Sequence, residues 1–190
     1  MGGLTMAKAV LISIRPEWVE KILSGEKTLE LRKTEPKLET PFKVYIYCTN
    51  QKNTILWNAR NYIYVDDHNH NAFDRCWNGS VVGEFVCDKI GVIWGGGYLK
   101  MPESAFAGSC LNIYQIDTYL DGKDGHFWHI SNLKIYDTPK ELTEFHTWGK
   151  CKSCSKSGYE STACIYDENC MVPVAITKAP QSWCYVEGLK

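Results

Sequence analysis

The feature that most constrains the fold of this chain is a series of short apolar runs rich in β-branched and aromatic residues. Turn residues separate the runs, and several alternate apolar with polar positions, which is the pattern of β-strands. We expect strands at residues 8–14, 27–33, 42–49 and 80–94, a strand pair or one long bent strand at 126–137, and a last strand within 179–188. Gly83, inside the fourth run, predicts a β-bulge.

Three short segments carry the start and stop signals of helices. Residues 15–25 have Pro16 in the first turn, apolar side chains at helical spacing, and Gly25 just past the end. Two further helices are expected from capping boxes: Asn112 with Gln115 for residues 113–120, and Thr138 with Glu141 for residues 139–145.

Many short strands with few helices favour an α+β fold over a wound parallel sheet. We therefore predict a small mixed β-barrel with short flanking helices, and the 190 residues suit a single domain over 1–190. Two polar segments without periodicity interrupt the pattern and are interpreted as insertions, at about residues 50–79 and 146–172. The first is expected to contain a short helix near residues 56–62.

Composition narrows the classes of partner. The formal net charge of −1 argues against strong nonspecific binding of duplex nucleic acid, although a local basic patch is compatible with it. No segment has the pattern of a secretion signal, a lipidation site or a membrane span. We expect a cytoplasmic protein with no membrane partner, and the sequence does not determine its oligomeric state.

Residues 25–33 place charged side chains around two leucines, directly after the glycine that ends the first predicted helix. In a strand, Glu30 and Arg32 would share one face and the leucines the other. Lys27 falls on the leucine face by this parity, so we expect it at the mouth of the strand or along a cavity. The pattern alone leaves two interpretations: an exposed edge strand protected by charges, or the wall of a pocket for a polar ligand.

Gly25, Lys27, Glu30 and Arg32 fit the pattern G-x-K-x-x-E-x-R. With this motif the chain resembles the ASCH domain family, which is PUA-like, and in particular the ASCH proteins common in phages and prophages. The similar segments are residues 13–36, 81–90, 128–145 and 179–187. The resemblance implies a PUA-like barrel with a cleft between strands and helix, related to domains that bind RNA or modified bases. It favours the pocket over the edge strand.

The function that the resemblance implies first is binding of RNA, or of a modified nucleoside or nucleotide, in a cleft lined by Lys27, Glu30 and Arg32. Arg15, just before the first predicted helix, is a further candidate for ligand binding, and Ser13 near the helix start could help to bind an anion. Trp128 and Trp183 would serve as stacking walls for a base. Each tryptophan alternatively fills the core.

One branch of the family hydrolyses the acetyl amide of acetylated cytidine nucleosides, with the motif lysine as base, a threonine three residues later as nucleophile, and a distant glutamate as proton donor. Lys27 matches, but Glu30 stands where the threonine is expected, and Thr28 points elsewhere by alternation. A Lys27–Glu30 pair could still activate water. Glu84 is the candidate for the distant glutamate, or alternatively pairs with Arg32. An amidohydrolase is thus one alternative function, and a phage regulatory or host-interaction protein is another.

The nine cysteines are an odd number and, without a secretion signal, are interpreted as reduced thiols or metal ligands. Four of them lie in the second insertion with the spacing C-x2-C-x9-C-x5-C: Cys151, Cys154, Cys164 and Cys170. Either they hold a structural zinc, with His146 as a substitute ligand, or they are plain thiols. The acidic and histidine residues at 66–70 are interpreted as a solvated loop. The motif itself requires no cofactor.

Overall fold

The computed structural model describes residues 8–50, 77–95, 103–150 and 171–189. In order along the chain, the elements are β1 (Lys8–Ile14), α1 (Pro16–Leu23), β2 (Leu29–Arg32), β3 (Phe42–Cys48), β4 (Val81–Ile93), α2 (Glu103–Ser109), α3 (Ile113–Leu120), β5 (Gly125–Lys140), the 3₁₀ helix η1 (Leu142–Glu144), β6 (His146–Lys150), β7 (Met171–Ala175) and β8 (Trp183–Glu187). None of these helices is long and apolar enough to cross a membrane.

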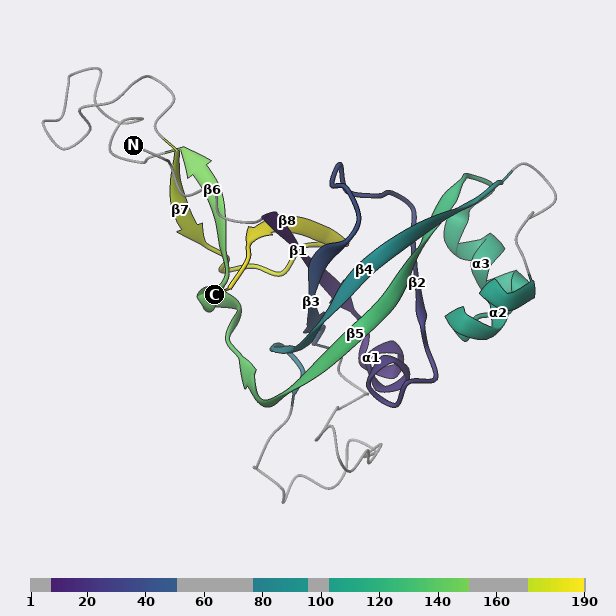
Figure 1. The fold of residues 1–190 in the computed structure, drawn as a ribbon, viewed down its shortest axis with the longest axis horizontal. Helices are drawn as coiled ribbons and strands as arrows, with labels where there is room; N and C mark the ends of the chain where they lie inside the picture. Colours follow the sequence, from purple (N-terminus) through teal and green to yellow (C-terminus); the bar gives the residue numbers. More distant parts are fainter. Residues whose placement is uncertain (1–7, 51–76, 96–102, 151–170, 190) are drawn as a thin grey trace, which may run out of the picture.

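Six strands form one mixed sheet in the order β2-β5-β4-β3-β1-β8. β1 and β3 pair in parallel, and the other neighbours pair antiparallel. α2 and α3 lie together beside the β2 end of the sheet, whereas β6 and β7 form a separate two-stranded sheet (Figure 1). The predicted α+β class is confirmed, and residues 126–137 belong to one long strand rather than to a pair.

The sheet is not closed into a barrel. β2 and β8 are its two ends, and no backbone ladder joins them in the part of the chain that the structure describes. Side chains connect these ends instead: Arg32 Nη1 donates to Ser182 Oγ at 3.3 Å, and Trp183 Nε1 donates to Thr34 Oγ1 at 3.1 Å. β2 has four residues, so it offers little backbone for a second ladder. The sheet thus curls until its ends touch through side chains.

Buried side chains form three clusters around this sheet. The largest lies between the sheet and α1, and contains Val10, Ile12, Val19, Ile22 and Trp128 among others. A second lies on the other face around Tyr45, Tyr136 and Phe145, and a third packs α2 and α3 against β2 and β5. β2 contributes Leu31 to the third cluster, and Glu30, Leu31 and Arg32 are all buried.

Several local signals are confirmed. Gly25 has φ +80°, a conformation that costs glycine little, and it follows the end of α1. The Asn112–Gln115 capping box has both hydrogen bonds, each 2.9 Å long. Gly83 lies at a register shift of β4, where a Cβ atom would come within 2.6 Å of the Lys134 carbonyl oxygen. Only glycine fits there without a backbone shift.

The predicted helix over 139–145 is wrong. β5 continues to Lys140, which pairs with Val81 of β4, and only the short η1 follows. The capping box is formed by Glu141 and Glu144, three residues later than expected. Pairing with β4 outweighs the local helix signal, because the strand gains ladder hydrogen bonds that a single helical turn does not offer. Helix α2 has no counterpart among the helices expected from the sequence.

The two predicted insertions are described only at their ends. The ends of the second become strands β6 and β7, which pair with one another. Near the end of the first, Trp77 is buried in the largest cluster and Gly79 turns the chain into β4. The helix expected near residues 56–62 lies outside the described residues.

Candidate functional site

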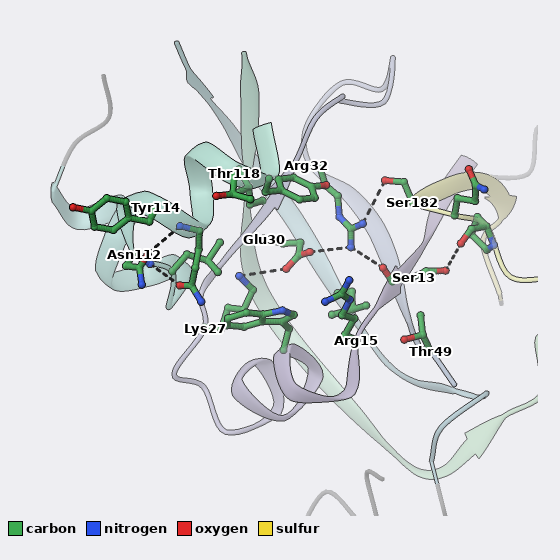
Figure 2. A pocket seen from close by; sticks show the side chains of 18 of the residues that line it. Ser13, Arg15, Lys27, Glu30, Arg32, Thr49, Asn112, Tyr114, Thr118 and Ser182 are labelled. Atoms are coloured by element: carbon green, nitrogen blue, oxygen red, sulfur yellow. Dashed lines mark hydrogen bonds and ion pairs between the residues drawn. The ribbon is translucent and has the colours of Figure 1, made fainter. Parts of the chain in front are cut away.

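A cavity of about 900 Å³ opens between the end of β1, the start of α1, strand β2 and helix α3 (Figure 2). It is lined by Ser13, Ile14, Arg15, Trp18, Lys27, Glu30, Leu31, Arg32, Thr49, Asn50, Leu111, Asn112, Tyr114, Gln115, Thr118, Tyr119, Pro180, Gln181 and Ser182. These residues come from segments far apart in the chain. All three charged residues of the sequence motif are among them.

Lys27 enters the cavity from the turn before β2 rather than from the strand itself. Its backbone N–H donates to the Lys21 carbonyl at 2.8 Å, which fixes the turn after α1. Its side chain is only 2% exposed, and Nζ donates to the Ser109 carbonyl at 2.8 Å. Nζ also lies 3.4 Å from Glu30 Oε2 and 5.5 Å from the centre of the Trp18 ring. Because Lys27 precedes the strand, strand parity does not apply to it.

Glu30 and Arg32 lie two residues apart on one face of β2 and form a close ion pair. Glu30 Oε1 is 2.9 Å from Arg32 Nη2, and the same Nη2 donates to the Ser13 carbonyl at 2.8 Å. Glu30 thus bridges two buried cations, as the dashed lines in Figure 2 show. We call Lys27, Glu30 and Arg32 the buried relay.

The burial of the relay decides between the two interpretations of the motif. Glu30 is 6% and Arg32 is 7% exposed, whereas charges that protect an edge strand lie in solvent. The solvated-edge interpretation is therefore wrong. Charged groups this deeply buried need partners, and here each finds at least one in the relay or in a backbone carbonyl.

Arg15 also lines the cavity, at its mouth. Its side chain is 67% exposed, and its nearest carboxylate oxygen, Glu17 Oε1, is 3.9 Å away. Ser13 belongs to the wall, where its hydroxyl donates to the Pro180 carbonyl at 2.6 Å.

Trp128 and Trp183 do not line the cavity. Trp128 is fully buried and packs edge-on against Phe42, with ring centroids 5.9 Å apart. Trp183 packs against Trp128 at 5.8 Å. Both tryptophans therefore fit the alternative interpretation, in which they fill the core rather than stack on a base. The aromatic side chains along the cavity are instead Trp18, Tyr114 and Tyr119.

Glu84 lies away from the relay. Its carboxylate accepts hydrogen bonds from Tyr136 at 2.7 Å and from Lys43 at 3.1 Å, next to the second cluster. The expected pairing with Arg32 is wrong, and Glu84 does not line the cavity of Lys27. Burial raises the pKa of the Glu84 carboxyl, but the hydrogen bonds from Tyr136 and Lys43 and the positive charges of Lys43 and Lys134 together outweigh burial and lower the pKa overall. Glu84 is therefore an ionised anchor of the sheet.

Sequence reasoning missed the contribution of α3. Tyr114, 80% exposed, and Tyr119 line the cavity from this helix. Burial raises the pKa of the Tyr119 phenol, so it is a hydrogen-bond donor at neutral pH. Sequence reasoning also missed Thr49, whose buried hydroxyl has no hydrogen-bond partner among the described residues. The capping box located the start of α3, but nothing in the pattern showed that this turn faces Lys27.

The predicted metal ligands Cys151, Cys154, Cys164 and Cys170 lie outside the described residues, as does the loop at 66–70. No group of three or more His, Cys, Asp or Glu residues that could hold a metal occurs in residues 8–50, 77–95, 103–150 and 171–189. His146 is described, and its Nδ1 lies 3.1 Å from the Glu144 carbonyl oxygen. The zinc site stays a prediction, which metal analysis of the purified chain would test.

Comparison with known proteins identifies the fold. No family model and no curated protein matches the sequence. The crystal structure of ASCH from Zymomonas mobilis matches with a TM-score of 0.51, at 16% sequence identity, over 93% of this chain and 86% of that chain. Two point variants of that protein match with the same TM-score at 16% and 15% identity, over 87% and 88% of their chains.

The chain has the ASCH fold. The similarity spans 93% of this chain and confirms the ASCH fold that the resemblance implied, although the sheet is not closed into a barrel. At this level of identity it carries no statement about activity.

Proposed function

We propose that this ASCH-fold chain binds RNA, or a modified nucleoside or nucleotide, in the cavity beside the buried relay. The observation that carries the proposal is the relay itself, in which Lys27, Glu30 and Arg32 are held by ion pairs at the wall of a cavity. The volume of the cavity, about 900 Å³, suits a ligand of nucleotide size, since small-molecule sites span ~300–1,000 Å³.

The groups along the cavity match the chemistry of a nucleobase and its sugar. Arg32 and Lys27 carry hydrogen-bond donors, and Glu30 carries acceptors for an exocyclic amine. Trp18 and Tyr114 present aromatic side chains, and bases stack on such rings with little sequence preference. Polar edges surrounded by aromatic faces are the usual way in which proteins hold unpaired bases.

A cavity-filling variant tests the proposal without disturbing the relay. Thr118 is an exposed residue of α3 that lines the cavity, so Thr118→Trp should block the site and abolish binding of a short fluorescent single-stranded RNA. Asp117→Trp is the matched control, because it puts the same ring one residue earlier on the same helix, at an exposed position that does not line the cavity. Anisotropy titrations would refute the proposal if both variants bound as the parent does, or if the parent bound neither RNA nor any nucleoside or nucleotide.

The alternative, an amidohydrolase acting on acetylated cytidine, makes a stricter demand on Lys27. A general base needs a lone pair that faces the substrate, yet Lys27 Nζ already donates to the Ser109 carbonyl at 2.8 Å and lies 3.4 Å from Glu30 Oε2, so its contacts tie it to the wall of the cavity. Thr28 is exposed and does not line the cavity, so it offers no nucleophile. Acetate release from acetylated cytidine, followed by mass spectrometry and lost in Lys27→Ala, would establish this alternative.

The phage-type branch of the family, a cytoplasmic location, and a role in host interaction belong to this proposal only as predictions from the sequence. A host-interaction role would leave partner binding intact when Thr118→Trp blocks the cavity. The same variant therefore separates a ligand site from a protein-binding surface.

A further inference from the structure

The cavity is rich in positive charge although the chain as a whole is not. Three cations, Arg15, Lys27 and Arg32, line it, against the single carboxylate of Glu30. The whole chain has a formal net charge of −1. Positive charge is therefore concentrated at this site, and a concave, low-dielectric wall focuses its field on whatever enters.

An excess of positive over negative charge is already present within the buried relay. Glu30 can neutralise only one of its two neighbours, so the relay holds an uncompensated positive charge at positions 7% exposed or less. Arg32 Nε is buried and has no hydrogen-bond partner in the part of the chain that the structure describes. A buried cation with an unused donor is costly, and a bound anion would relieve both costs.

Arg15 extends the positive charge to the mouth of the cavity. Its side chain is 67% exposed, and its guanidinium forms a loose ion pair with Glu17, whose Oε1 at 3.9 Å is beyond hydrogen-bonding distance. A guanidinium of this kind can bind two oxygens of one phosphate. The two arginines thus offer anion-binding groups inside the cavity and at its entrance.

We infer that the ligand of this cavity carries a phosphate group, and that the site selects nucleotides or a single-stranded RNA backbone over uncharged nucleosides. The inference rests on the proposed function and names its ligand class. Arg15 holds the phosphate at the mouth, and the relay supplies the positive field behind it. The base lies along Trp18 and the face of α3.

Calorimetry on the full chain tests this with the four ribonucleosides, their 5′-monophosphates, inorganic phosphate and a short single-stranded RNA. At least one monophosphate should bind about tenfold or more tightly than its nucleoside, and inorganic phosphate should compete with it. The preference should shrink as NaCl rises from about 50 to about 200 mM, because salt screens the charge of an open site. Tighter binding of RNA than of every monophosphate would identify a strand as the source of the phosphate, and the reverse order would identify a free nucleotide.

Arg15→Gln should reduce the preference for the monophosphate several-fold. Lys21→Gln is the matched control, since it removes one positive charge from α1, the helix that Arg15 precedes, at a residue that pairs with Glu26 and does not line the cavity. Equal affinity for a nucleoside and its monophosphate would overturn the inference and leave the proposed function standing. Equal losses in the two variants would overturn the role of Arg15. Failure of every nucleoside, monophosphate and RNA to bind would overturn the proposed function itself.

Discussion

Glu30 is the residue on which the stability of the site should depend most. Its carboxylate lies 2.9 Å from Arg32 Nη2 and 3.4 Å from Lys27 Nζ, and all three side chains are nearly inaccessible to water. At an effective dielectric constant of about 20, each contact corresponds to a gross attraction of about 5 kcal/mol, from which the cost of desolvating the carboxylate must be subtracted. Removing one partner of a buried pair costs about 3–5 kcal/mol. Glu30→Gln leaves two cations facing a neutral amide, so we expect a loss within that range.

Urea unfolding followed by tryptophan fluorescence measures this loss, with the slope m checked for two-state behaviour. Glu26→Gln is the matched control, because it makes the same chemical change in an ion pair that is 3.2 Å long but 62% exposed at the carboxylate. Surface pairs contribute about 0–1 kcal/mol, so the control should stay close to the parent. Adding Lys27→Met to Glu30→Gln should restore part of the stability. Equal effects of the two single variants would refute the account of the relay as a buried, mutually dependent cluster.

Three further predictions concern other parts of the molecule. The pKa of the Glu84 carboxyl is lowered in the folded state, so the contribution of the ionised carboxylate to folding stability is present above the unfolded-state pKa and is lost as pH falls through the folded-state pKa. In urea unfolding at a series of pH values, the difference in stability between the parent and Glu84→Gln should be widest near neutral pH and should narrow below about pH 4. A difference that stays constant with pH would contradict this. Tyr114→Ala should weaken RNA binding about fivefold or more, while Ile113→Ala, also exposed but outside the cavity lining, should not, because a stacked base contributes about 1–3 kcal/mol. Burial raises the pKa of the Cys87 thiol to about 12, so iodoacetamide should leave Cys87 unmodified in the native chain and alkylate it in urea. Peptide mass spectrometry measures the modification. Alkylation of Cys87 in the native chain would contradict the prediction and would show that the strand opens.

Much of the local structure could be predicted because its causes lie within a few residues. Pro16 and Gly25 bound α1, the Asn112–Gln115 box starts α3, and Gly83 marks the bulge of β4. Each is a backbone preference or a hydrogen bond of short range. The prediction of a helix over 139–145 is wrong because a long-range contact decides this segment: Val81 of β4 pairs with Lys140, and this pairing outweighs the local helix signal.

The sequence alone determined the strand pattern, the ends of α1 and α3, and the charged motif of Lys27, Glu30 and Arg32. It could not determine that these charges are buried, because their burial requires β2 to pair with β5, about a hundred residues away, and Arg32 to meet Ser13 and Ser182 from distant segments. Nor could it choose Trp18 and Tyr114 over Trp128 and Trp183 as the aromatic residues of the cavity, since spacing does not fix which elements meet. The tertiary structure decided both, because a cavity forms where distant segments pack together, and its chemistry belongs to their arrangement in space.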